Sequence, residues 1–208
     1  MTITDHDKLA LVDYLKKRLD FLKNCKAYVE KRLSDDERQF INTCDDEDIC
    51  RKYFCHIDYA LRNTFRYCML IAYCSFLEES VKLLCERSVA DYSAKLNAIR
   101  RGTWLSKHRQ LLRRHTALDL AAMAEDLDTM EDFVAVRNCI VHAWGNLDKC
   151  RNKARLREIV EKRRDLLATT EDGFLVVERD AVSTASVTSR KLVNKLLKDL
   201  LGPPPKSI

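Results

Sequence analysis

The sequence predicts an all-α helical bundle, and three observations support this prediction. No glycine or proline occurs before Gly102, and the three prolines stand together at 203–205. Apolar residues recur at helical spacing through most of the chain. Only one short segment, 173–177, has the apolar run expected of a strand. Because glycine and proline disfavour a helix interior most, such a chain should be helical nearly throughout.

The first half of the chain predicts long helices. Over residues 5–33 the apolar side chains follow one another at steps of three, four or seven, as Leu9, Val12, Leu15, Leu19, Leu22, Val29 and Leu33. Ser34 with Glu37 three residues later has the form of a capping box, which predicts that a second helix begins there. A further helical stretch covers 46–89 and carries its apolar face at Leu70, Tyr73, Leu77, Val81 and Leu84.

The second half predicts shorter elements. Short helices over 91–100 and 103–115 flank Gly102. Thr129 as an N-cap and Gly145 as a C′ residue predict a helix over 130–144. The remaining elements are a basic helix, an extended piece that forms half of a hairpin, and a last helix, at 148–168, 173–177 and 184–201. The predicted fold class is therefore an all-α bundle with a short β-hairpin near residues 173–182.

The length of 208 residues predicts a single domain over 1–202, followed by a tail at 203–208. Within it, 60–200 form the core and 1–58 a helical extension. Hydrophobic residues at 46% and charged residues at 33% fit a protein with a real core and exclude general disorder. The N-terminus resembles no secretion signal, and no apolar run approaches the ~18 residues of a membrane span. We therefore expect a cytoplasmic protein with no membrane partner.

The nine cysteines are an odd set, mostly within helical sequence, which favours reduced thiols over disulfides. Four neighbouring side chains raise the alternative of a zinc site: Cys44, Cys50, Cys55 and His56. No C-x-x-C pair occurs among them, and the five-residue step from Cys50 to Cys55 turns a helix by about 140°. The sequence therefore predicts neither a metal ion nor a cofactor.

Charge is more segregated than the net value of +5 indicates. The segment 98–115 contains no acid, and the segment 149–164 holds eight basic residues against Glu158 and Glu161. A basic surface with an aromatic ring suits single-stranded RNA, so we predict RNA-binding residues at Arg100, Arg101, Trp104, Lys107 and Arg109. Solvated helix faces explain the same pattern equally well.

The most informative segment runs from Phe133 to Gly145 and contains Arg137, Asn138 and His142. On a helix, Asn138 and His142 lie one turn apart, beside small side chains that leave room for a ligand, Ala135 and Cys139. Arg137 falls instead within an apolar stripe made of Phe133, Val136, Ile140 and Trp144. A guanidinium placed there needs a carboxylate, a phosphate or a subunit interface, because an unpaired buried charge is costly.

This segment resembles the signature of the HEPN superfamily, in which an arginine is followed by a polar residue and, after a short spacer, by a histidine on an apolar helix. Here the spacer between Arg137 and His142 has four residues. The helical segment from Ser75 to Leu84 resembles the family's acidic helix, with Glu78 as the better match and Glu79 in reserve. The resemblance extends over about residues 60–200 of the chain.

The resemblance implies a metal-independent endoribonuclease of the toxin or antiviral-defence kind, with Arg137, Asn138, His142 and Glu78 as catalytic residues. The chemistry fits the residue types. Histidine titrates near neutrality and can move the proton of a ribose 2′-OH, which yields a 2′,3′-cyclic phosphate and a 5′-OH. Arginine can bind the scissile phosphate. No carboxylate cluster for a two-metal site occurs in the sequence.

Other interpretations stay open. The chain can be a non-catalytic HEPN module that binds nucleotide or RNA, the partner half of a toxin–antitoxin pair, or a helical adaptor. Arg137 can form an ion pair with Glu78, and His142 can be a helix-end histidine favoured by the dipole. The expected partners are RNA, an inhibitor or antitoxin protein, and a second copy of the chain. The dimer would meet along the stripe of Phe133, Ile140 and Trp144, so that two motifs form one cleft.

Overall fold

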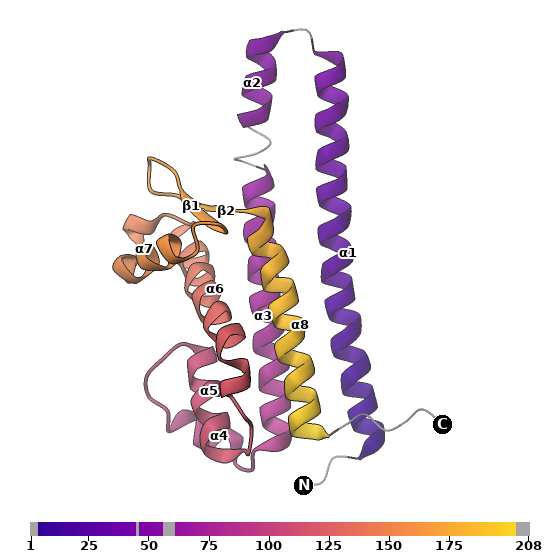
Figure 1. The fold of residues 1–208 in the computed structure, drawn as a ribbon, viewed down its shortest axis with the longest axis vertical. Helices are drawn as coiled ribbons and strands as arrows, with labels where there is room; N and C mark the ends of the chain where they lie inside the picture. The colour runs from indigo at the N-terminus through magenta and orange to yellow at the C-terminus, as the bar shows by residue number, and fades with distance from the viewer. Residues whose placement is uncertain (1–3, 45, 56–60, 203–208) are drawn as a thin grey trace. The chain divides into compact units, whose positions relative to one another are not determined.

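A computed structural model describes residues 4–44, 46–55 and 61–202 (Figure 1). The chain is 79% helical, with eight α-helices and one two-stranded sheet in the described ranges, so the all-α prediction is confirmed. No helix in these ranges has the length and apolar character that crossing a membrane requires. The near absence of glycine and proline accounts for the high helix content.

The helices are α1 (Asp5–Thr43), α2 (Glu47–Cys55), α3 (Asn63–Ser88), α4 (Tyr92–Asn97), α5 (Trp104–His115), α6 (Ala124–Ala143), α7 (Lys153–Lys162) and α8 (Arg179–Leu201). Two 3₁₀ turns are η2 (Ala121–Met123) and η3 (Leu147–Lys149), and the strands are β1 (Leu167–Thr169) and β2 (Leu175–Val177). The predicted stretch 46–89 thus contains α2 and α3, and the predicted tail at 203–208 lies outside the described residues.

The predicted helix start at Ser34 is wrong, because α1 continues through this residue to Thr43. Ser34 is exposed, so its hydroxyl can face water within the helix at little cost. Arg32 Nε lies 3.3 Å from Asp36 Oδ1 one turn later, which supports the helix across the predicted break. A capping pattern alone therefore does not start a new helix where nothing ends the preceding one.

The helix that carries the motif begins earlier than predicted, at Ala124 rather than residue 130. Thr129 is buried inside α6 and is not its N-cap. The chain enters α6 through η2, where Asp119 Oδ1 accepts the backbone N–H of Ala121 at 3.0 Å. Asp119 therefore supplies the capping interaction that the sequence assigned to Thr129.

The β-hairpin is confirmed, but its position is shifted toward the N-terminus from the predicted 173–182. Strands β1 and β2 pair antiparallel, with Leu167 opposite Val177 and Thr169 opposite Leu175. The predicted basic helix over 148–168 is shorter than expected, because α7 ends at Lys162. The first strand, β1, begins at Leu167, near the end of that predicted helix. Burial of Leu167, Leu175 and Val177 explains the strand, since this packing is not visible in local sequence.

The chain divides into two compact units, each made of separate segments. Unit 1 comprises Met1–Leu19, Tyr73–Val136 and Thr184–Ile208, and unit 2 comprises Asp20–Ala72 and Arg137–Ser183. The single domain over 1–202, with its extension at 1–58, stays a prediction.

Unit 1 packs the beginning of α1 and most of α8 with α3 to α6. Its core includes Tyr73, Leu77 and Leu84 of α3 together with Met130 of α6 and Leu192 of α8. Polar contacts join the same helices. Tyr14 Oη donates to Glu79 Oε1 at 2.8 Å, and Ser189 Oγ donates to Met130 Sδ at 3.8 Å. The apolar face predicted for residues 46–89 is therefore buried in the part of this stretch that belongs to unit 1.

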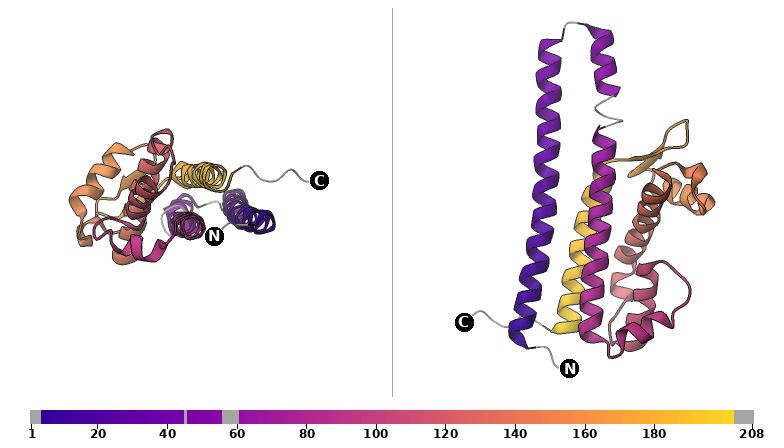
Figure 2. Two further views of the ribbon diagram at one scale, coloured as in Figure 1. Left: turned by 90° about the horizontal axis from the view of Figure 1, so that it is seen from below. Right: turned by 180° about the vertical axis from the view of Figure 1, so that it is seen from behind.

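Unit 2 contains α2, α7, the hairpin and the remaining parts of α1, α3, α6 and α8. Within it, α1 and α2 are antiparallel neighbours (Figures 1 and 2). The rings of Phe40 and Tyr53 stack between them with centroids 3.8 Å apart. Asn63 ties α3 to β2, because its Nδ2 donates to the carbonyl of Leu175 at 3.0 Å and its Oδ1 accepts from the N–H of Val177 at 2.9 Å.

Candidate functional site

The motif residues lie in the last turns of α6 and belong to unit 2. Arg137 and Asn138 are half-buried, and His142 is exposed. Arg137 Nη1 donates to Asn138 Oδ1 at 3.0 Å. The Arg137 Nε is buried and has no hydrogen-bond partner among the described residues. The structure thus holds a cation and an exposed imidazole on one helix.

The end of α6 has an unusual backbone. The helix ends at Ala143, and both Trp144 and Gly145 follow with positive φ, 54° and 77°. The Gly145 N–H donates to the carbonyl of Cys139 at 3.3 Å, which closes the helix. A left-handed conformation costs a non-glycine residue about 1–2 kcal/mol, so the fold must hold Trp144 in place. As a result, the Trp144 side chain is 86% exposed.

Gly145 is held between α3 and β2. A Cβ at this position would lie 2.9 Å from Tyr67 Cζ and still closer to its hydroxyl oxygen. That hydroxyl donates to the carbonyl of Leu175, and the Leu175 N–H donates to the carbonyl of Gly145 at 2.9 Å. Burial raises the pKa of Tyr67, which keeps the hydroxyl protonated as a donor. Only glycine satisfies both the positive φ and this close approach.

A hollow of about 650 Å³ lies beside this helix end. We call it the aromatic hollow; it is lined by Asn63, Tyr67, Trp144, Thr169, Thr170, Glu171, Asp172, Phe174 and Leu175. Phe174 is 40% exposed, so two solvent-facing rings border the same space. A flat heteroaromatic ring can stack on such side chains, and carboxylates can accept hydrogen bonds from its amino groups.

Cys139 does not leave room for a ligand, contrary to the sequence prediction. Its thiol is buried, and its Sγ lies 2.6 Å from the Sγ of Cys150. Burial, together with the hydrogen bond from Cys150, raises the pKa of Cys139 to about 12. This side of α6 is therefore filled by the segment that follows η3.

The apolar stripe also differs from its predicted role as a dimer edge. Phe133, Val136 and Ile140 are all buried. They cannot offer a surface to a second copy of the chain. Of the predicted edge, Trp144 is exposed, and so are the neighbouring Val141 and His142.

Glu78 belongs to unit 1, where its negative charge favours protonation of His108 and opposes ionisation of Tyr92. Tyr92 Oη and His108 Nε2 are 2.8 Å apart. The reserve candidate, Glu79, pairs with Arg18 and accepts from Tyr14. The role of Glu78 as the acid of the motif stays a prediction.

The basic segment 98–115 does not bring its five predicted RNA-binding residues together as free groups. Arg100 and Arg101 are exposed, and Lys107 is half-buried. Arg109 Nη1 lies 2.7 Å from Asp128 Oδ1 and 3.5 Å from Glu131 Oε1 on α6. Trp104 is half-buried and packs edge-on against His108, with ring centroids 6.1 Å apart. Arg100 and Arg101 remain the accessible candidates.

No group of three or more His, Cys, Asp or Glu side chains that could hold a metal ion occurs among the described residues. Two members of the zinc alternative, the side chain of Cys55 and His56, lie outside the part of the chain that the structure describes. Cys25, Cys44, Cys68, Cys85, Cys139 and Cys150 are thiols that form no disulfide.

Sequence reasoning missed most of the aromatic hollow. Tyr67 and Phe174 are far from the motif in sequence and reach it only through folding. Trp144 was the available signal, because it directly precedes the glycine that ends the motif.

No protein-family model, no curated protein and no solved structure matches this chain. The resemblance of residues 133–145 to the HEPN signature therefore stays a prediction.

Proposed function

We propose that the chain is an endoribonuclease that cuts cellular RNA in the cytoplasm without a metal ion. One observation carries the proposal: an exposed His142 shares the end of α6 with Arg137, whose guanidinium is hydrogen-bonded to Asn138. One rigid helix thereby presents a proton-transfer group and a phosphate-binding group.

The reaction assigns each side chain a separate task. His142 takes the proton of the 2′-OH, the 2′-oxygen bonds to phosphorus, and the bond to the 5′-oxygen breaks. The leaving 5′-oxygen takes up a proton from water, and His142 later returns its proton to water, so the products are a 2′,3′-cyclic phosphate and a 5′-OH. Arg137 stabilises charge on the non-bridging oxygens. Asn138 orients Arg137 through the 3.0 Å hydrogen bond, and its amide N–H groups can donate to phosphate or ribose.

The aromatic hollow supports RNA as the substrate. Trp144 is two residues from His142 in the chain and lines the hollow together with Phe174 and Tyr67. A base that stacks there would position its ribose near the end of α6.

The working unit in this proposal is a homodimer. Arg137 and His142 point about 140° apart around the helix, so a single copy presents a divided surface to one phosphate. Two copies related by a dyad can combine the arginine of one with the histidine of the other. The contact would use the exposed Val141 rather than the buried stripe. For a toxin of this kind, an antitoxin that covers the same surface would suppress cleavage.

The test is an RNA cleavage assay with purified protein in the presence of EDTA, followed by analysis of the RNA ends. We expect cleavage to persist and to give cyclic phosphate and 5′-OH ends, while 2′-deoxy substrates stay intact. Products with 5′-phosphates, or strict dependence on a divalent ion, would contradict the mechanism. RNA that is bound but never cut would instead favour the non-catalytic binding module.

A further inference from the structure

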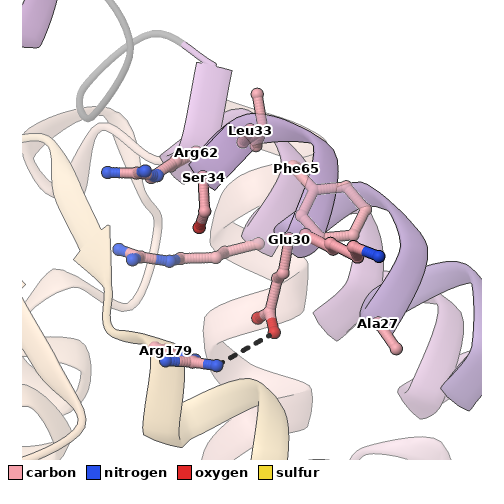
Figure 3. A pocket seen from close by; sticks show the side chains of 9 residues that line it. Ala27, Glu30, Leu33, Ser34, Arg62, Phe65 and Arg179 are labelled. Atoms are coloured by element: carbon pink, nitrogen blue, oxygen red, sulfur yellow. Dashed lines mark ion pairs between the residues drawn. The ribbon is translucent and has the colours of Figure 1, made fainter. Parts of the chain in front are cut away.

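A second polar hollow in unit 2 has no part in the proposed cleavage. It has a volume of about 470 Å³ and lies where α1, the start of α3 and the start of α8 meet (Figure 3). We call it the basic pocket; its charged lining residues are Glu30, Lys31, Arg62, Arg66 and Arg179. Four cations thus face one carboxylate.

Two of these arginines are only loosely paired. Arg66 Nη1 lies 3.9 Å from Glu178 Oε2. Arg179 Nη2 lies 3.6 Å from Glu30 Oε2 (Figure 3). Charge-assisted hydrogen bonds between arginine and a carboxylate are about 2.7–2.9 Å long. Both ion pairs are therefore longer than a direct hydrogen bond. Arg66 Nη1 also donates to the carbonyl of Val177 at 3.2 Å, so an anion in the pocket approaches Arg179 more directly than Arg66.

The carboxylate that lines the pocket is shared between two cations. Glu30 is shared between Arg179 and Lys26, whose Nζ lies 3.4 Å away. Glu37 pairs with Arg62, and Glu178 is the distant partner of Arg66. Glu30 thus serves both Lys26 and Arg179, while Lys31 adds another cation to the lining.

Two of the cations are also partly shielded from water. The side chains of Arg62 and Arg66 are only 18% and 20% exposed, which strengthens their interaction with a bound anion relative to a surface arginine. Phe65 adds an apolar wall to the same hollow. Several cations, the planar donors of the arginines and one aromatic ring suit a phosphate group attached to an organic residue.

We propose that the basic pocket binds the phosphate group of a nucleotide or of RNA, with Arg66 and Arg179 as its principal ligands. The proposal does not depend on cleavage at His142. A binding measurement on His142→Ala protein separates the two, since that protein should not cut RNA yet keeps the pocket intact.

The experiment is titration calorimetry of full-length His142→Ala protein with inorganic phosphate, adenosine monophosphate and a short RNA. We expect Arg179→Gln to weaken binding about tenfold. Arg179 is 71% exposed, so its loss should not unfold the chain. Arg51→Gln is the matched control, because Arg51 is an exposed arginine of unit 2 that pairs with Asp48 away from the pocket lining.

The three ligands distinguish the source of the phosphate. Tighter binding of adenosine monophosphate than of inorganic phosphate supports a phosphate monoester as the ligand. Binding of RNA alone supports a phosphodiester. Either result supports the pocket as the site if Arg179→Gln weakens the binding. Arg66→Gln should act in the same direction if circular dichroism shows it folded. Absence of binding for all three ligands, or equal binding by the Arg179→Gln and Arg51→Gln proteins, would overturn the proposal.

Discussion

Two regions of the molecule are rich in arginine and contain a tryptophan, yet they use these residues differently. In unit 1, Arg109 is bound by Asp128 and Glu131, and Trp104 packs against His108. In unit 2, the Arg137 Nε has no hydrogen-bond partner among the described residues, and Trp144 is 86% exposed. Neighbouring carboxylates and ring contacts, rather than the number of basic residues, therefore decide which arginines and aromatic rings are available to a ligand.

The largest difference in cleavage rate should be between variants of two exposed histidines, His142 of unit 2 and His115 of unit 1. His142→Ala should lower cleavage by about 10²- to 10⁴-fold, because it removes the group that transfers protons. Arg137→Ala should cost about 10²- to 10³-fold, and Asn138→Ala less, since a neutral hydrogen bond contributes only ~1 kcal/mol. Cleavage rates and thermal melting curves test this.

The matched control is His115→Ala, which removes an exposed histidine at the end of α5 in unit 1. It should leave cleavage unchanged. If His115→Ala and His142→Ala lower the cleavage rate equally, the motif does not carry the catalysis. If the motif variants unfold, its residues have a structural role.

Two glycines with nearly equal backbone φ angles, one in each unit, should differ in how much stability their replacement by alanine costs. Gly145 and Gly202 have φ of 77° and 79°, but a Cβ meets Tyr67 at Gly145 and nothing within 4 Å at Gly202. Gly202→Ala should therefore lose about 1–2 kcal/mol of unfolding free energy from backbone strain alone. Gly145→Ala should lose a further ~1–3 kcal/mol from overpacking. Denaturant unfolding measures both, and equal losses would mean that Tyr67 moves aside.

The exposed ring of Trp144 should matter for RNA and not for folding. Trp144→Ala should weaken RNA binding by about 1–3 kcal/mol, the contribution of one stacked base. Phe21→Ala is a suitable control, because Phe21 is another exposed ring of unit 2 and is absent from the lining of the hollow. Fluorescence anisotropy of labelled RNA reports the affinity. A similar loss for both variants would indicate a nonspecific effect.

The arginines of the basic segment 98–115 should differ in their contribution to RNA binding, because Arg100 and Arg101 are exposed and Arg109 is ion-paired. The double change Arg100→Ala with Arg101→Ala should flatten the salt dependence of RNA binding, by about 0.7 in logarithmic slope for each phosphate of a single strand that the protein no longer neutralises. Arg109→Ala should leave that slope unchanged and lower stability slightly, because its partly exposed ion pairs contribute ~1 kcal/mol or less. If Arg109→Ala has the larger effect on the slope, the engaged arginine binds RNA after all.

The smallest effect concerns pH and is confined to unit 1. Burial lowers the pKa of His108, despite its hydrogen bond to the carbonyl of Trp104, so the folded chain resists protonation. Below the unfolded pKa of about 6.5 the unfolded chain takes up this proton and the folded chain does not, so stability falls as pH drops toward the folded pKa. Unfolding of His108→Gln protein at pH 7 and pH 5 should show a smaller decrease than wild type, whereas His115→Ala should not.

The helical content followed from the sequence because it depends on composition and spacing. The predicted helix over 103–115 agrees with α5, which begins where Thr103 Oγ1 accepts the N–H of Ser106 at 3.2 Å. Ser34 and Thr129 have similar capping patterns but lie inside helices. A cap acts only where the preceding residues leave the helix, and that is decided by packing beyond the local window.

The candidate site was predictable only where it is local. The placement of Arg137, Asn138 and His142 on one helix followed from their spacing. The hollow did not, because Tyr67 and Phe174 come from α3 and the hairpin. The filled space beside Cys139 was missed for the same reason, since Cys150 returns to it after η3.

The chain has two tryptophans, and each unit contains one of them. Trp144 is exposed to solvent and Trp104 is half-buried, so the emission of Trp144 should lie at longer wavelength. A Trp104→Phe protein would therefore emit from unit 2 alone, where a stacked base would quench the signal. A Trp144→Phe protein would emit from unit 1 alone. Comparing their melting curves would show whether the two units unfold together or in sequence, without an added dye or label.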